Sequence, residues 1–220
     1  MSLPFPLQAD YSIVVDPAYG GPYKGLSYGP RHESDILLEL ARSIQKSWGK
    51  QKQNPLTITR LGDYEMSLDQ RRAMVNSKDR AIFLHLSLAH RKKNPDPWVR
   101  IHVHKPDQPT KESVLIPLEK VSEIYLDGSI ALASEMALSL PSNGQSGQVM
   151  ISSLPLAPLI GIAAPAVALE IFLTPSSYDP NFDLSMQIQQ LSQKILLALD
   201  LFVEKGIFRR HEKKRRQRNS

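Results

Sequence analysis

The chain is predicted to form one α/β domain, a three-layer α/β/α arrangement around a mostly parallel central sheet of about six strands. Short β-branched and apolar segments alternate along its 220 residues with longer segments whose apolar residues recur at helical spacing. Hydrophobic residues make up 41% and charged residues 22%, a balance typical of a globular domain. The alternation and the composition together favour a sheet covered by helices on both faces.

Five segments are predicted to be strands because they are short, rich in β-branched or aromatic residues, and bounded by turn-forming residues. They are residues 11–16, 56–60, 80–88, 98–104 and 165–173. The first ends at Pro17 and a pair of glycines, which indicates a buried strand that runs into a loop. Residues 98–104 alternate apolar and polar side chains, so this strand is expected to be more exposed.

Four segments are predicted to be helices, at residues 34–48, 68–77, 129–140 and 184–203. In the last, leucine and isoleucine recur every three or four residues, which indicates an amphipathic helix that closes the domain. Residues 105–128 contain three prolines and are expected to form a loop with one short helical or extended piece. Residues 141–147 are predicted to be a loop.

The positive charge is concentrated at the carboxyl end of the chain. Seven basic residues stand against one glutamate between positions 209 and 218, a net +6, so the rest of a chain of net charge +5 carries −1. A body this close to neutral does not indicate a specific nucleic-acid site. We therefore divide the chain into an extension (1–10), a folded domain (11–207) and a basic tail (208–220). The tail is expected to be disordered and solvated or to contact an anionic surface.

Several kinds of site and location are constrained by what the sequence lacks. The absence of cysteine excludes disulfides, thiolate metal sites and cysteine nucleophiles. No Gly-x-Ser-x-Gly motif is present, so a serine hydrolase is not indicated. No apolar run reaches about 18 residues, so no transmembrane segment is expected. The first ten residues lack the features of a signal peptide. We therefore expect either a cytoplasmic protein or, if a leader has been removed, a periplasmic or cell-envelope protein, and the sequence does not distinguish the two.

Residues 13–21, a strand followed by Asp-Pro-Ala-Tyr-Gly-Gly, resemble the opening motif of the N-acetylmuramoyl-L-alanine amidases, a strand followed by Asp-Pro-Gly-His-Gly-Gly. The resemblance continues in order over residues 11–207. It includes Glu33, Thr59-Arg60, Asp63, Leu68, Arg71, Asn76, Phe83 to Ala89, Pro165 to Glu170, and Phe172. It implies an enzyme that holds one zinc through two histidines and a glutamate, uses a further glutamate as general base, and cuts the amide between muramic acid and the first alanine of the wall peptide.

The chain departs from the family at two of the three implied zinc ligands. The resemblance places Tyr19 and Ser87 at the two histidine positions, whereas Glu33 keeps the third ligand position and Glu170 keeps that of the general base. Neutral phenols and hydroxyls are poor zinc ligands beside imidazole. We expect no bound zinc and no other cofactor. With no metal between them, Glu33 and Glu170 would repel each other, and one of them is expected to stay protonated.

The remaining residues of the predicted pocket are Arg60 and Arg71, which we consider as ion-pair partners of Glu170. His85 lies on the same strand face as Ser87 and is a possible substitute ligand for zinc. His90 is a second possible substitute, although a position in a solvent-exposed loop is also consistent with its sequence. His102 and His104 have the spacing of some metal pairs, but we favour an ordinary exposed strand face.

The leading functional hypothesis is an amidase-like domain that lacks zinc and does not hydrolyse the amide. Such a pseudoenzyme would bind peptidoglycan or a cell-wall protein, or have a regulatory role. One alternative is an active, zinc-dependent peptidoglycan hydrolase with a rearranged ligand set. A weaker alternative is an intracellular scaffold that is anchored by its basic tail.

Overall fold

The computed structural model describes residues 11–49, 54–90, 99–105, 118–140, 149–173 and 183–205. The predicted extension (1–10), the predicted loop (141–147) and the basic tail (208–220) lie outside these ranges. Within them, no helix is both long enough and apolar enough to cross a membrane.

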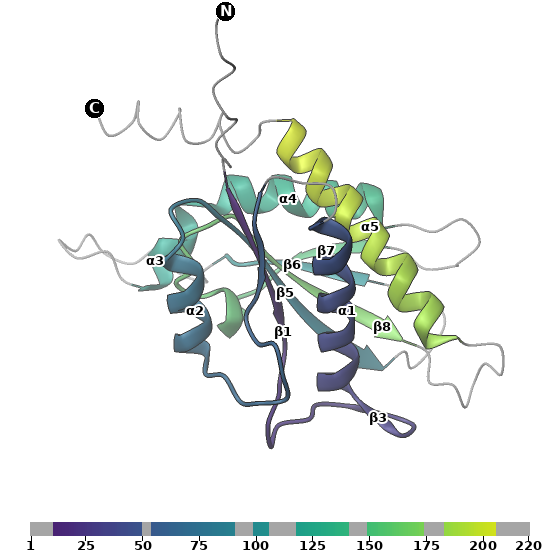
Figure 1. Ribbon diagram of the computed structural model, residues 1–220. Helices are drawn as coiled ribbons and strands as arrows, with labels where there is room; N and C mark the ends of the chain where they lie inside the picture. The colour runs from purple at the N-terminus through teal and green to yellow at the C-terminus, as the bar shows by residue number, and fades with distance from the viewer. Residues whose placement is uncertain are drawn as a thin grey trace, which may run out of the picture.

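A six-stranded sheet forms the centre of the domain, with the strand order β4-β1-β5-β8-β6-β7 (Figure 1). The strands are β1 (Ser12–Pro17), β4 (Leu56–Ile58), β5 (Ala81–His90), β6 (Val99–Val103), β7 (Val149–Ser153) and β8 (Ala166–Leu173). Strands β4, β1, β5 and β8 are parallel to one another, β6 is antiparallel to β8, and β7 is parallel to β6. The predicted α/β class and mostly parallel sheet are confirmed.

The helices surround this sheet in the order in which the sequence predicts them. They are α1 (Glu33–Trp48), α2 (Leu68–Asn76), α3 (Leu118–Glu123), α4 (Leu126–Ser139), the 3-10 helix η1 (Ala157–Leu159) and α5 (Leu184–Glu204). A small antiparallel pair, β2 (Ser27–Tyr28) with β3 (Arg31–His32), precedes α1. The sequence did not predict this pair or β7, because two-residue strands and an edge strand with exposed apolar residues lack a clear periodic pattern.

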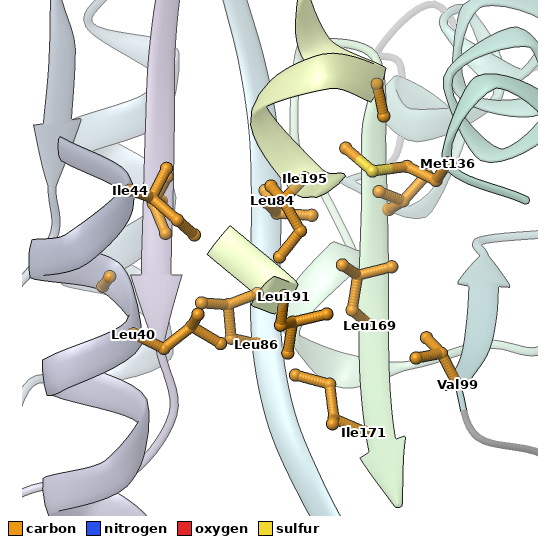
Figure 2. Packing of buried hydrophobic residues seen from close by; sticks show 14 of the residues in the cluster. Leu40, Ile44, Leu84, Leu86, Val99, Met136, Leu169, Ile171, Leu191 and Ile195 are labelled. Atoms are coloured by element: carbon orange, nitrogen blue, oxygen red, sulfur yellow. The ribbon is translucent and has the colours of Figure 1, made fainter. Parts of the chain in front are cut away.

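One face of the sheet is covered by α1, α4 and α5, which pack on a single large apolar cluster. Figure 2 shows this contact: Leu40 and Ile44 of α1 and Leu191 and Ile195 of α5 lie against strand residues such as Leu84. The strand residues of this cluster alternate along the chain, because side chains two residues apart on a strand point to the same face. Helices α1 and α5 also contact each other (Figure 1).

The opposite face is apolar only over the first half of the parallel strands. Val75 of α2 and Leu159 of η1 pack there on Val14, Phe83 and Ala168. The next residues on the same face, towards the carboxyl ends of the strands, are polar in β1, β5 and β8: Asp16, His85, Ser87 and Glu170. The change from apolar to polar side chains along this face defines where the candidate site lies.

Local interactions fix the helix that borders this polar region. Ser67 and Gln70 form a reciprocal capping box at the start of α2. At the end of α2, the Asn76 amide donates to Gly161 O at 2.9 Å and its oxygen accepts from Ala163 N at 2.8 Å. The first pair sets where α2 begins, and the second ties its end to the loop that leads into β8.

Replacing Leu84, which is fully buried at the centre of the large cluster, tests the packing of the first face. Leu84→Ala should lower the free energy of unfolding by about 2–5 kcal/mol, since a cavity remains where the side chain was. Leu138, also a leucine but 74% exposed on α4, provides the control. Leu138→Ala should change stability by less than about 0.5 kcal/mol in the same denaturant titration. Equal effects of the two variants would contradict this assignment of the core.

Candidate functional site at the carboxyl ends of the parallel strands

The loop after β1 carries Tyr19 in a left-handed conformation, with φ of 62°. Its side chain is 44% exposed, and its ring edge lies against the backbone of Gly25. A Cβ atom at Gly25 would come within 2.8 Å of Tyr19 Cδ2 and 2.5 Å of Glu33 Oε2. Gly25 therefore allows Tyr19 and Glu33 to approach the same stretch of backbone, and no larger residue would fit.

Two arginines hold this loop through its backbone oxygens. Arg60 is fully buried and donates to the carbonyls of Pro17, Ala18 and Ser34 at 2.8–3.1 Å. Arg71 donates to Pro17 O at 3.0 Å and to Tyr19 O at 3.1 Å. Because these carbonyls are inside the protein, the two guanidinium groups supply donors that water would otherwise provide.

Asp16 is a buried carboxylate with three partners from three different segments. Its oxygens accept hydrogen bonds from Thr59 Oγ1 and from the guanidinium of Arg71, and Oδ2 lies 2.7 Å from His85 Nδ1. Burial opposes ionisation, but the hydrogen bonds and charges of His85, Arg71 and Thr59 outweigh it, and the pKa of Asp16 is held below its usual value. This cluster fixes the end of β1 relative to β4, α2 and β5.

Glu33, the first residue of α1, uses both carboxylate oxygens to accept backbone hydrogen bonds. Oε1 accepts from Leu88 N at 2.6 Å and Oε2 from Leu26 N at 3.0 Å. Burial is the main cause that raises the pKa of Glu33, and the negative charge of Glu170 adds to it, whereas the two backbone donors and His85 oppose it. Glu33 thereby joins the start of α1 to the end of β5 and to the segment before β2.

Glu170 lies on β8 opposite Arg100 of β6 and beside Ser87 of β5. Its Oε2 accepts from Arg100 Nη1 at 2.7 Å and lies 3.4 Å from His102 Nε2. The hydrogen bond from His102 lowers the pKa of Glu170 most, and the charge of Arg100 lowers it further against the effect of burial. The Arg100 guanidinium also lies 5.0 Å from the centre of the Phe172 ring.

The ion-pair partners predicted for Glu170 were wrong. Arg60 and Arg71 are occupied by the loop carbonyls and by Asp16, and the partners of Glu170 are Arg100 and His102. The reason is that strand register, which the sequence does not state, sets Arg100 directly opposite Glu170. The predicted repulsion between two carboxylates agrees in direction with the raised pKa of Glu33.

The predictions for the histidines had mixed outcomes. His102 and His104 are both buried, so the exposed strand face expected for them was wrong. His85 does share a strand face with Ser87, and it is hydrogen-bonded to Asp16. His90 is the last residue of β5 and is partly buried, with its ring centre 4.8 Å from that of Tyr28.

Ser87, at the second implied histidine position, is partly buried and donates to Leu169 O at 3.4 Å. In the part of the chain that the structure describes, no three His, Asp or Glu side chains are grouped so that they could hold a metal ion. Sequence reasoning missed Arg100 and Ser152, which complete the polar row on this face. In the sequence, only the alternation of apolar and polar residues over 98–104 indicated that Arg100 and His102 lie on the same face of a strand.

The sequence that forms these elements matches the model of a known family. The family model for N-acetylmuramoyl-L-alanine amidase matches residues 13–200, most of the chain. The chain belongs to this amidase family. Among curated protein sequences, none matches the chain.

Solved structures of amidases show the same fold. The structure of Ami1 from Mycobacterium smegmatis matches with a TM-score of 0.63 and 15% identity, over 90% of this chain and 98% of that one. The catalytic domain of CwlV from Bacillus (Paenibacillus) polymyxa var. colistinus gives 0.61 and 14%, over 88% and 98%. An amidase from Clostridium difficile 630 gives 0.57 and 20%, over 89% and 98%. At these identities the likeness is one of fold.

The Asp16 cluster leads to a prediction about acid stability. Because the pKa of Asp16 is lower in the folded chain than in the unfolded chain, its ionised form stabilises the fold at neutral pH. That contribution is lost as the pH falls below the usual range of an aspartate. Asp16→Asn should lower the free energy of unfolding by about 3–5 kcal/mol at pH 7, since Arg71 is left buried without its anion. The difference from the wild type should shrink as the pH falls below about 4, the usual pKa of an aspartate.

Asp69 provides the control, since its side chain is 86% exposed and pairs with Arg72 at the protein surface. Asp69→Asn should cost less than about 1 kcal/mol. Urea titrations of both variants at several pH values make the comparison. A difference between Asp16→Asn and the wild type that does not vary with pH would contradict the assigned ionisation.

Proposed function

We propose that this member of the amidase family binds peptidoglycan without a catalytic zinc and does not hydrolyse the muramoyl amide by the mechanism implied for its family. The observation that carries the proposal is the engagement of Glu33. Both of its carboxylate oxygens accept backbone hydrogen bonds, from Leu26 N and Leu88 N. A metal at this position would have to compete with donors that are built into the fold.

The other two implied ligand positions support the same conclusion. Zinc sites in enzymes use three nitrogen, oxygen or sulfur ligands and an open position for water. Tyr19 would have to ionise to be an effective ligand, but burial and the negative charge of Glu33 both raise the pKa of its phenol. Ser87 offers a hydroxyl that donates to Leu169 O. One occupied carboxylate, one neutral phenol and one hydroxyl do not fit the group.

The pKa of Glu170, the general base that the resemblance implies, also does not suit that role. A base must accept a proton near neutral pH, whereas His102 and Arg100 hold the pKa of Glu170 below its usual value. The Arg100 side chain lies at 2.7 Å on the same carboxylate oxygen. This supports a role for Glu170 as one half of a fixed ion pair on the binding surface.

The surface that remains is suited to a peptide or glycan with many hydrogen-bonding groups. It presents the exposed Tyr19 ring, the Ser87 hydroxyl and the partly exposed Glu170–Arg100 pair. Aromatic rings and paired charges of this kind bind polar chains through stacking and hydrogen bonds. Peptidoglycan is the substrate class that the family name implies, so we propose that recognition is kept and hydrolysis is lost.

A working zinc amidase with rearranged ligands is the second candidate, with His85 or His90 as the substitute. The hydrogen bond between His85 Nδ1 and Asp16 does not favour His85, because a move towards Glu33 would leave Asp16 with one partner fewer. His90 lies two residues after Leu88, whose N–H contacts Glu33, but its strand parity places it on the face opposite Ser87. The basic tail, on which the scaffold hypothesis rests, lies outside the described residues.

Metal content and hydrolysis test the first half of the proposal. The purified full chain, loaded with excess zinc and dialysed, should retain well below one zinc per chain and release no peptide from peptidoglycan. The C. difficile 630 amidase, treated in parallel, controls for loading and assay. One tightly bound zinc per chain together with hydrolysis would establish the rearranged site, and its loss in His85→Gln or in His90→Gln would then identify the ligand.

Retention on insoluble peptidoglycan tests the second half. The wild-type chain should sediment with purified wall material, and Tyr19→Ala should weaken retention at least about tenfold, as expected for loss of a stacked aromatic ring worth more than about 1.4 kcal/mol. Leu197 on α5 is the matched control, with a similar exposed fraction (52%) on a helix of the other face. Leu197→Ala should bind as the wild type does. Equal retention of Tyr19→Ala and the wild type would exclude this surface, and no retention of the wild type would exclude a wall ligand.

A further inference from the structure

Ser152 of the edge strand β7 lies next to a buried histidine that in turn lies next to a carboxylate. Its Oγ is 2.6 Å from His102 Nδ1, and His102 Nε2 is 3.4 Å from Glu170 Oε2. The three residues come from the adjacent strands β7, β6 and β8, and they share one sheet face. A hydroxyl, an imidazole and a carboxylate in this order are the arrangement that activates a serine nucleophile.

We infer that Ser152, His102 and Glu170 form a metal-independent acyl-transfer site that acts on esters of apolar acyl groups. This site goes beyond the proposed wall-binding function. The nucleophile lies on β7 and the base on β6, towards the edge of the sheet that is farther from β1 and Tyr19. The two sites share Glu170, so the tests below change only Ser152 and His102.

The hydrogen-bond pattern gives Ser152, His102 and Glu170 each a defined role. The Arg100 guanidinium lies 2.7 Å from Glu170 Oε2 and favours the ionised carboxylate. The carboxylate therefore accepts a hydrogen bond from His102 Nε2–H. His102 Nδ1 is then the unprotonated nitrogen that can accept the Ser152 proton. Glu170 acts here as a positioning residue, because it sets the tautomer and stabilises the imidazolium that forms. The 3.4 Å separation is within the range over which such contacts tighten when a substrate binds.

Backbone geometry supplies a donor for the oxyanion. Leu154 N donates to Val103 O at 3.1 Å, so the N–H of residue 154 points towards β6. Because backbone groups alternate along a strand, the N–H of residue 153 points the other way, towards the edge of the sheet on which no described strand lies. This is the N–H that follows the nucleophile, a position that forms oxyanion holes in other serine hydrolases.

The surroundings of Ser152 indicate the kind of acyl group. Met150 is 44% exposed and Leu154 is 43% exposed, and both have the strand parity of Ser152. Apolar side chains that flank a partly exposed hydroxyl favour an acyl chain over a charged substrate.

The reaction balances without a further reactant except water. Ser152 Oγ bonds to the acyl carbon while its proton moves to His102 Nδ1. The ester C–O bond then breaks, and the leaving alcohol takes the proton from His102. Water repeats the two steps on the acyl-serine, with His102 again accepting and then returning the proton, which releases the carboxylic acid and restores Ser152.

The test is labelling of the full chain with a fluorophosphonate in the presence of EDTA, followed by peptide mapping and by hydrolysis of p-nitrophenyl butyrate. Ser152 should be labelled, Ser152→Ala should abolish both signals, and His102→Gln should slow both by at least about 100-fold. The chain offers a matched control in Ser27, whose Oγ lies 3.4 Å from His32 Nδ1. Ser27 should not be labelled, and Ser27→Ala should behave as the wild type.

The inference is overturned if Ser152 is not labelled, if Ser27 is labelled at the same rate, or if His102→Gln labels as fast as the wild type. His102 is buried, so circular dichroism must show that His102→Gln keeps the native fold. If it does not, the ratio of Ser152 to Ser27 labelling in the wild type decides the matter. Failure of wall binding would leave these outcomes unchanged, because none of them uses Tyr19 or peptidoglycan.

Discussion

Asp16 is a carboxylate near the end of strand β1, between β4 and β5, where it has no access to water. Burial of an unpaired charge is costly, so the fold around it must supply donors, and it does so from Thr59, Arg71 and His85. These partners come after β4, from α2 and from β5. One buried charge therefore fixes the relative positions of three elements, and the loop with Tyr19 begins two residues further on. Arg71 extends the same constraint, since it also binds carbonyls of that loop.

The face of the sheet that carries Asp16 and Glu170 has two different halves along its strands. Its first half is apolar and packs on α2 and η1, and its second half is a row of polar side chains. The row is possible because each member has a partner: Asp16 with Arg71, Glu170 with Arg100, and His102 with Ser152. Buried and half-buried polar groups are tolerated only when they are satisfied in this way. The polar row is therefore a rigid surface, which suits both of the roles that we propose for it.

The two acidic residues that the resemblance places at a ligand position and at the base position have different surroundings. Glu33 accepts two backbone hydrogen bonds and has a raised pKa, whereas Glu170 pairs with Arg100 and has a lowered pKa. Two glutamates of one site thus differ in the direction of their pKa shifts, because the environment sets the pKa. Retention of a residue type in a motif is accordingly a weaker argument for a retained mechanism than the hydrogen bonds that the residue makes.

The sequence alone determined the α/β class, the positions of the main helices and strands, and the family resemblance, and it led to the prediction that Tyr19 and Ser87 stand at the two histidine positions. These features depend on local composition and on the order of residues along the chain, which are read directly. Only the tertiary structure decided that Arg100 pairs with Glu170, that His102 is buried between Glu170 and Ser152, and that both oxygens of Glu33 are occupied. With one exception, each of these contacts joins residues that are 50 or more positions apart in the sequence. The exception is the contact of Leu26 with Glu33, which are seven positions apart. Register and helix docking are set by the packing of the whole core, so no local pattern could have revealed them.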